Sequence, residues 1–244
     1  MSQGRVISVA SLNLHGGVDR HGRPYDVAAA CHLLKADVIA LQEVWRADGE
    51  PDEFAAVATA LGGQARHGRM ASGISLARLR VGPEDGRTGV WGVAVLTSLP
   101  VLRYEEINLG RAPLDGLPRL AQALTLAVPG GGTLRIVNTH LTHRMTSPAQ
   151  LILLTSRLNR DGATAGLYTS PTLIAGDLNM PGAATWTAGH GYRRVVRGLT
   201  FPAHRPLVQI DHLLASRGIR AEAAEVLPEV GSDHLPVRAQ LLLG

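Results

Sequence analysis

Cysteine is nearly absent from the sequence: Cys31 is the only one in 244 residues. An intrachain disulfide is therefore excluded, and a reducing compartment fits the composition. The chain also lacks an apolar run of about 18 residues, the length that crosses a membrane as a helix. It opens on a polar segment rather than on the basic and then apolar stretches of a secretory signal. We expect a cytoplasmic protein with no membrane association, and no obligate protein partner is evident.

Lysine is as scarce as cysteine, since Lys35 is the only lysine among the 24 basic residues. The formal net charge is +4 and the isoelectric point is about 9.8, so arginine carries almost all of the positive charge. Arginine suits two-point contacts with phosphate. A charge of +4 over this length also fits an ordinary solvated surface, so the composition leaves both interpretations open.

No linker rich in Pro, Gly or Ser interrupts the sequence, and no repeat of fixed period is visible. With 45% hydrophobic residues the chain can bury a substantial core, and we expect a single domain over residues 1–244. Glycines at 130–132 predict a hairpin turn, whereas residues 62–90 predict a loop with little regular structure. The apolar patterns predict helices at 26–34, 52–61 and 150–159, and strands at 5–13, 37–43, 90–97, 121–128, 133–140, 172–176, 209–215 and 236–243.

Polar side chains recur where these apolar strands begin or end. Rigid strands hold side chains accurately, so strand ends at one edge of a sandwich can converge on one site. Eight residues share this kind of position: Asn13, Glu43, His140, Asp177, Asn179, Asp211, Asp233 and His234.

Each of these residues also has an ordinary structural interpretation. An Asn or Glu at a strand end usually forms a turn or faces solvent, and a histidine such as His140 is more often a hydrogen-bonded core residue than a catalyst. Residues 176–179 fit an Asx turn, and residues 232–234 fit a simple loop. His212 lies beside Asp211, but strand alternation points it to the opposite face. Only the joint occurrence of all eight residues, in this order, indicates a site.

Short stretches around these residues carry a wider pattern: SLNLHG (11–16), LQEV (41–44), VAVLTSLP (93–100), VNTHL (137–141), AGDLN (175–179), TFP (200–202), QIDHLL (209–214) and SDHLP (232–236). Together and in this order they resemble the endonuclease/exonuclease/phosphatase superfamily, which has the deoxyribonuclease-I-like fold. Each stretch alone is a loose pattern, but the set is highly specific and spans nearly the whole chain. The resemblance implies an α/β four-layer sandwich. Two mixed β-sheets would pack face to face, flanked by helices, with the site at one edge.

The resemblance also implies a metal site. Glu43 would be the main magnesium ligand, with Asn13 and Asp233 beside it, and manganese is the alternative ion. Magnesium is a hard ion that prefers carboxylate, amide and water oxygens, which agrees with this set. Zinc fits less well, because Cys31 has no thiolate partner nearby in sequence and no paired His/Cys spacing occurs.

The remaining five residues would carry catalysis, again as the resemblance implies. Asp177 would orient or deprotonate the attacking water, and Asn179 would bind the scissile phosphate. His140 would contact a phosphate oxygen. Asp211 would hold the imidazole of His234, and such a pair supplies an oriented imidazole near neutral pH.

Two positions depart from the family pattern. Val93 stands where members often have Asn, and Gln209 stands where many have Arg before the Ile-Asp pair. We expect altered substrate contacts rather than lost chemistry. Some relatives also hold the middle histidine with a carboxylate; Glu84 and Asp85 lie in the corresponding region, and the sequence assigns neither.

These features predict a magnesium-dependent hydrolase of phosphodiesters, with a nucleic acid or a nucleotide as substrate. A phosphatase or phospholipid phosphodiesterase is the alternative, and an inactive binding scaffold is a third possibility that the complete set of site residues disfavours. Arg119 and Arg144 are candidate substrate contacts. The form of residues 138–141 differs from the abasic-site repair branch, and the charge is modest, so we expect a compact substrate or a short single strand. Diester or monoester preference, endo or exo cleavage and oligomeric state stay open.

Overall fold

The computed structural model describes residues 6–112, 115–143, 146–164 and 170–244. Within them, twelve strands form two six-stranded sheets, with the orders β11-β12-β1-β2-β4-β3 and β5-β6-β7-β8-β10-β9. The first sheet contains β1 (Val6–Asn13), β2 (Val38–Ala47), β3 (Gln64–Ile74), β4 (Gly89–Thr97), β11 (Ile219–Val226) and β12 (Val237–Leu243). The second contains β5 (Val101–Gly110), β6 (Arg119–Ala127), β7 (Thr133–His140), β8 (Thr172–Asp177), β9 (Arg193–Arg194) and β10 (Asp211–Ala215). The helices are η1 (His15–Gly17), α1 (Val27–Leu33), α2 (Glu53–Ala60), α3 (Leu76–Leu79), α4 (Ser147–Thr164) and α5 (Gly182–Ala188).

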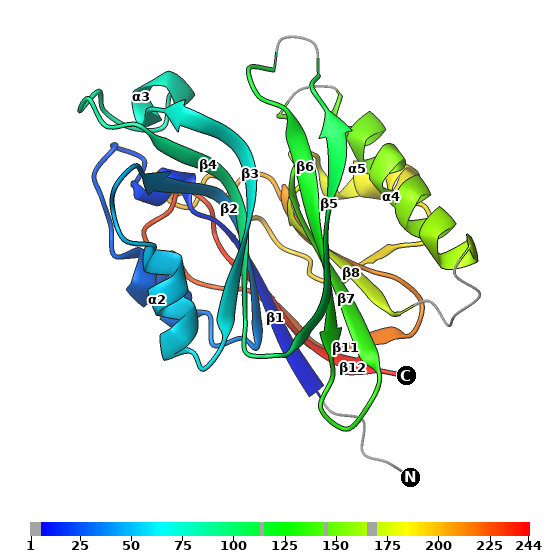
Figure 1. Cartoon of the computed structure of the whole chain (residues 1–244). Helices are drawn as coiled ribbons and strands as arrows, with labels where there is room; N and C mark the ends of the chain where they lie inside the picture. The colour runs from blue at the N-terminus through cyan, green and yellow to red at the C-terminus, as the bar shows by residue number, and fades with distance from the viewer. Residues whose placement is uncertain (1–5, 113–114, 144–145, 165–169) are drawn as a thin grey trace.

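The two sheets pack face to face over a shared apolar core. Val9 from the first sheet and Leu124 and Leu213 from the second belong to one fully buried cluster between them. The helices cover the outer faces: Phe54 of α2 packs on the first sheet, and Leu154 of α4 packs on the second. Figure 1 shows α2 on one side of the sandwich and α4 and α5 on the other. These are the four layers that the family resemblance implies.

Both sheets are mixed. β1 runs parallel to β2 and antiparallel to β12, and β7 runs parallel to β8 and antiparallel to β6. The carboxyl ends of β1 and β2 therefore lie at the same end of the first sheet, where β12 begins. The carboxyl ends of β7 and β8 lie together in the second sheet, where β10 begins, since Asp211 pairs with Asp177.

The sequence prediction for residues 62–90 is wrong. This segment contains β3, which pairs antiparallel with β4, and the short helix α3. β3 is an edge strand whose Gly- and Arg-rich sequence buries only Gly68, Met70 and Ile74, so its apolar signal is weak. The edge strands β5 and β11 were not predicted for the same reason, because most of their side chains are exposed or half-buried.

No helix among the described residues is long and apolar enough to cross a membrane. Because the central core takes side chains from both sheets, we propose that the chain forms one domain, as the sequence predicts.

Candidate active site

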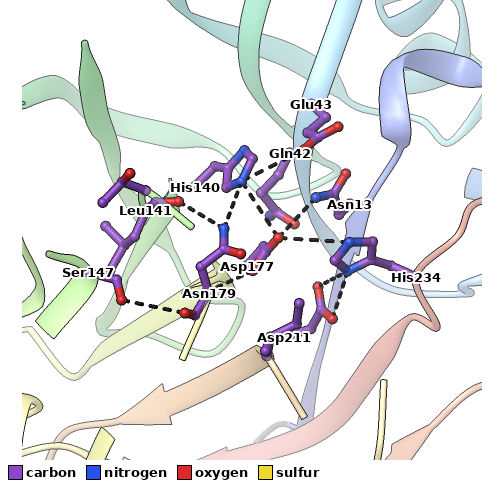
Figure 2. Close-up of polar contacts among 12 residues, drawn as sticks. Asn13, Gln42, Glu43, His140, Leu141, Ser147, Asp177, Asn179, Asp211 and His234 are labelled. Atoms are coloured by element: carbon purple, nitrogen blue, oxygen red, sulfur yellow. Dashed lines mark hydrogen bonds and ion pairs between the residues drawn. The ribbon is translucent and has the colours of Figure 1, made fainter. Parts of the chain in front are cut away.

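The eight residues singled out at strand ends lie at one end of the sandwich. Asn13 ends β1, His140 ends β7, Asp177 ends β8, and Asp211 begins β10. Asp233 and His234 lie in the loop that leads into β12, whose strand pairs with β1. The two sheets therefore bring residues from positions 13 to 234 into one cluster, which Figure 2 shows.

Glu43 reaches this cluster through a local irregularity in β2. The pairing of β2 with β4 shifts register between Leu41 and Val44, so two residues of β2 stand opposite one residue of β4. Glu43 itself has a φ of 52°, in the left-handed region that ordinary residues avoid. Such bulges re-aim side chains, and strained backbone of this kind gathers at functional sites. Without the bulge, strict alternation would place Glu43 differently relative to the site.

Asp177 lies at the centre of the cluster (Figure 2). One oxygen accepts from the backbone N–H of Asn179 at 2.8 Å, and the other accepts from Nδ2 of Asn13 at 3.1 Å. The second oxygen also lies 3.6 Å from Nε2 of His140 and 3.9 Å from Nε2 of His234. Burial and the neighbouring carboxylate of Asp211 raise the pKa of Asp177 to about 7, against the opposing effect of His234. A carboxyl with that pKa can accept a proton near neutral pH.

Asp211 and His234 form a buried pair. Nδ1 of His234 lies 3.1 and 3.0 Å from the two carboxylate oxygens of Asp211. The ring of Phe201 packs on the imidazole with a centroid distance of 4.8 Å. Burial alone would lower the pKa of His234, but the charge and hydrogen bonds of Asp211 raise it to about 10. The imidazole is therefore held as a cation, with its Nε2 directed towards Asp177.

His140 and Asn179 form the other side of the cluster. Nδ2 of Asn179 lies 3.1 Å from Nε2 of His140 and donates to the carbonyl oxygen of Leu141 at 2.9 Å. Burial, with the positive charges of Arg119 and His234, holds the pKa of His140 well below its ordinary value. Neutral His140 thus accepts from Asn179 and orients its amide. Asn179 also has a positive φ, 51°.

The carboxylates that flank His140 are Glu43 and Asp177, with oxygens 3.7 and 3.6 Å from its Nε2. The two acids that the sequence left unassigned lie elsewhere. Glu84 and Asp85 are exposed, and Asp85 pairs with Arg87 at 2.7 Å. Nδ1 of His140 is buried and has no hydrogen-bond partner in the part of the chain that the structure describes.

Arg119 lies beside the cluster at the start of β6. Its guanidinium is buried and pairs with Asp115 at 2.9 Å, while Nη1 has no hydrogen-bond partner among the described residues. It lines a cavity of about 310 Å³ together with Met70 and Leu120. A second cavity, of about 200 Å³, is lined by Asp233. Arg144 lies outside the described residues.

Two further side chains contact the cluster, and sequence reasoning gave them no role. Nδ1 of His15 lies 3.7 Å from an oxygen of Asp233. The hydroxyl of Ser232 donates to the carbonyl oxygen of Asn13 at 2.6 Å and so joins the β12 loop to the end of β1. Both lie inside motif stretches, SLNLHG and SDHLP, which is the signal that could have identified them.

The donor set of the cluster fits a divalent cation. Buried oxygens of Glu43 and Asp233 have no hydrogen-bond donor among the described residues. Burial raises the pKa of Glu43, and the positive charges of His234 and His15 offset this only in part. The ligand atoms of Asp177, Asp211 and His234 also lie within 4.8 Å of one another. Asp211 and His234 already satisfy each other, whereas Glu43 and Asp233 do not, so the unsatisfied oxygens fit the ion better.

The comparisons with known proteins point to a single family. The family model described as "Endonuclease/Exonuclease/phosphatase family" matches residues 10–234. A search of curated proteins found no match. Among solved structures, the chain is similar to an endonuclease/exonuclease/phosphatase from Beutenbergia cavernae, with 23% identity and a TM-score of 0.71, over 98% of this chain and 72% of that one.

Two other solved structures are similar over nearly their whole length. The human nocturnin catalytic domain, solved with bound sulfate, shares 19% identity with a TM-score of 0.76, over 98% of this chain and 94% of that one. A mannosyl-6-phosphatase from Bacteroides thetaiotaomicron shares 16% identity with a TM-score of 0.69, over 97% of this chain and all of that one. At these identities the likeness shows a common fold.

Proposed function

The chain belongs to the endonuclease/exonuclease/phosphatase family, and from this membership we propose that it is a magnesium-dependent hydrolase of phosphodiesters. The observation that carries the proposal is the cluster around Asp177. There a buried Asp–His pair, a buried acid with a pKa near 7 and unsatisfied carboxylate oxygens face one another. Asp177 and Asp211 are both buried beside the buried His140 and His234, and burying such charges is costly, so a cluster of this kind favours a functional role over a structural one.

We assign the metal to Glu43, with Asn13 and Asp233 beside it and manganese as the alternative ion. When bound, the ion would neutralise charge on the phosphate oxygens and help to orient the substrate. The residues present meet the needs of magnesium, which prefers oxygen ligands and keeps several waters. The unsatisfied oxygens of Glu43 and Asp233 are the atoms that would take part.

Asp177 is assigned to the attacking water. Its two oxygens are held by Asn13 and by the backbone of Asn179, so the carboxylate has one fixed orientation. An acid whose pKa is near 7 accepts a proton most effectively at neutral pH. Asp177 would therefore orient the water in line with the scissile bond and take up its proton.

His234 is assigned to the charge that develops on the phosphate. Asp211 keeps the imidazole protonated and fixes its ring, so Nε2 presents an N–H to the centre of the site. This donor is in place before the reaction, and preorganised donors in a buried site stabilise developing charge strongly. On the opposite side, Asn179 would exchange its bond to Nε2 of His140 for one to a phosphate oxygen, with His140 beside it, and Arg119 would extend this contact.

We propose a compact substrate: a nucleotide or a short single strand. The cavities of about 310 and 200 Å³ beside the cluster each have room for a group the size of a nucleoside or sugar. The solved nocturnin domain carries a sulfate, an anion of phosphate-like shape. The mannosyl-6-phosphatase named above favours a second candidate, a sugar phosphomonoester.

A cytoplasmic location is also proposed, because Cys31 is buried with a free thiol, which fits a reducing compartment. An obligate protein partner is not part of the proposal.

The test is a panel of substrates assayed with magnesium, with manganese and with excess chelator. The panel holds a chromogenic diester, dinucleotides, a short single strand, abasic duplex DNA and sugar phosphates. We expect hydrolysis of the diesters and the single strand that chelation abolishes and magnesium or manganese restores. Activity confined to monoesters would support the second candidate, and full activity in excess chelator would refute the metal mechanism.

A further inference from the structure

A buried polar layer joins the two sheets directly beneath the cluster. Gln42, from the bulge of β2, and Asn138, from β7, are fully buried in this layer. Nε2 of Gln42 donates to Oδ1 of Asn138 at 2.8 Å and to the hydroxyl of Ser11 at 3.1 Å. None of these side chains belongs to the chemistry assigned above. Figure 2 shows Gln42 next to Glu43.

Asn138 bonds to both strands that frame the bulge. Its Nδ2 donates to the carbonyl oxygen of Leu41 on β2 at 3.0 Å and to that of Ala94 on β4 at 2.9 Å. Leu41 and Ala94 are the last regular pair before the register shift that presents Glu43. One carboxamide on the second sheet therefore contacts the first sheet at the point where its ladder breaks.

Asn138 is also connected to His140, on the other side of the site, through the backbone of β7. Asn138 lies two residues before His140 on β7, so the two side chains lie on the same face of that strand. The oxygen of Glu43 and Nε2 of His140 are 3.7 Å apart although they come from different sheets. That spacing depends on how the sheets are docked, and apolar contacts alone do not fix docking to this accuracy.

We propose that Asn138, with Gln42, is a positioning clamp that holds the Glu43 bulge and sets its distance from His140, and thereby sets the metal affinity of the site. The proposal rests on the proposed function, because it takes Glu43 as the metal ligand. The positive φ of Glu43, 52°, is a strained backbone conformation that persists only when surrounding contacts hold it. Without a bound metal, these contacts have to come from the protein itself. The bonds from Asn138 supply them from the opposite sheet.

Gln122 offers a matched control. It is as fully buried as Asn138, pairs with it across β6 and β7, and donates to the carbonyl oxygen of Arg66 on β3 at 3.0 Å. It also links the two sheets, and its Oε1 accepts from Nδ2 of Asn138 at 3.3 Å, but among the described residues it forms no hydrogen bond with β2 or β4. A role in stability alone would make Gln122 and Asn138 equivalent, whereas a role in positioning Glu43 separates them.

The experiment compares Asn138→Leu and Gln122→Met with the wild-type protein. Manganese binding is measured by calorimetry, and amide hydrogen exchange at residues 42–44 is measured in the metal-free protein. We expect Asn138→Leu to raise the dissociation constant for Mn²⁺ at least tenfold and to speed the exchange, and Gln122→Met to change the constant less than twofold. Asn138→Ser, which is smaller and can be hydrated, replaces the leucine variant if that one fails to fold.

Unchanged Mn²⁺ affinity and unchanged exchange in the folded Asn138 variant would overturn the clamp. An equal loss of affinity in the two variants would do the same, because it would show only general loosening. Wild-type protein that binds no Mn²⁺ would count against the proposed function instead, and the exchange data would still decide on the clamp.

Discussion

Replacing Asp211 with Asn tests the central pair of the site. The two side chains are almost the same size, so the change removes charge while keeping shape. In the native protein both oxygens of Asp211 lie about 3 Å from Nδ1 of His234, and the two side chains are only 1% and 7% exposed. Water cannot replace the missing charge in this buried position. The variant should therefore lose the free energy of unfolding that is typical of breaking a buried ion pair, about 3–5 kcal/mol.

The direction of the effect on His234 follows from the same balance. Burial opposes the imidazolium, and Asp211 is the main group that overcomes it and raises the pKa to about 10. In the variant burial prevails, so the pKa falls and the imidazole becomes neutral at pH 7. We expect kcat to fall about 10³-fold, which corresponds to about 4 kcal/mol. Lowering the pH should not restore this activity, because Asp177, the proposed base with a pKa of about 7, takes up a proton in the range where the imidazole regains its own.

The assay measures kcat and KM for a chromogenic phosphodiester at saturating magnesium, for Asp211→Asn, His234→Ala and the double variant. Circular dichroism checks that each variant is folded. Because the pair works as a unit, the double variant should lose little more than His234→Ala alone. Losses that add in free energy, or a variant whose His234 pKa stays near 10 by NMR titration, would refute the assignment.

Three further predictions concern the metal and the substrate. Glu43→Gln keeps the shape but removes the charge, so the magnesium concentration for half-maximal activity should rise about tenfold or more; an unchanged requirement would remove Glu43 from the metal site. Because burial raises the pKa of Glu43, protons compete with the ion for this carboxyl more than for an exposed one; metal affinity should therefore fall as pH is lowered, which calorimetry at several pH values measures. Binding of a short single strand should weaken only gently with salt, with a log–log slope smaller than about 3, whereas a steep slope on duplex DNA would contradict the compact substrate.

The strands that carry the site could be predicted from the sequence, and the edge strands could not. Residues 172–177 form a fully buried strand whose apolar run ends at Asp177, so the sequence predicts both the strand and its polar end. His212 also follows simple alternation: its Nε2 bonds to the carbonyl oxygen of Met180, away from Asp211's partner His234. β3 and β5, in contrast, are edge strands whose side chains are mostly exposed or half-buried, so they pair with β4 and β6 without a strong apolar pattern of their own.

The local geometry of Glu43 shows where sequence reasoning stops. The apolar pattern predicts a strand that ends at this residue, yet β2 continues to Ala47 beyond a change of register. A bulge depends on how two strands pair, and neither the register of β2 against β4 nor a positive φ at a Glu has a signature in the residues themselves. Val93 and Gln209, the two positions that depart from the family pattern, are both buried. Gln209 donates to the carbonyl oxygen of Val196.

The pairing of β1 with β12 has a consequence for how the protein comes to be active. β1 lies inside the first sheet, and its neighbour on one side is the last strand of the chain, with Val6 opposite Leu242. Asp233 and His234 reach Asn13 only through this pairing, so a growing chain on the ribosome has no complete site. At about 5–20 residues per second, more than ten seconds separate the synthesis of Asn13 from that of His234. Under the proposed function, a nascent chain would carry no hydrolytic activity before β12 is made, and activity would show that β12 has paired with β1.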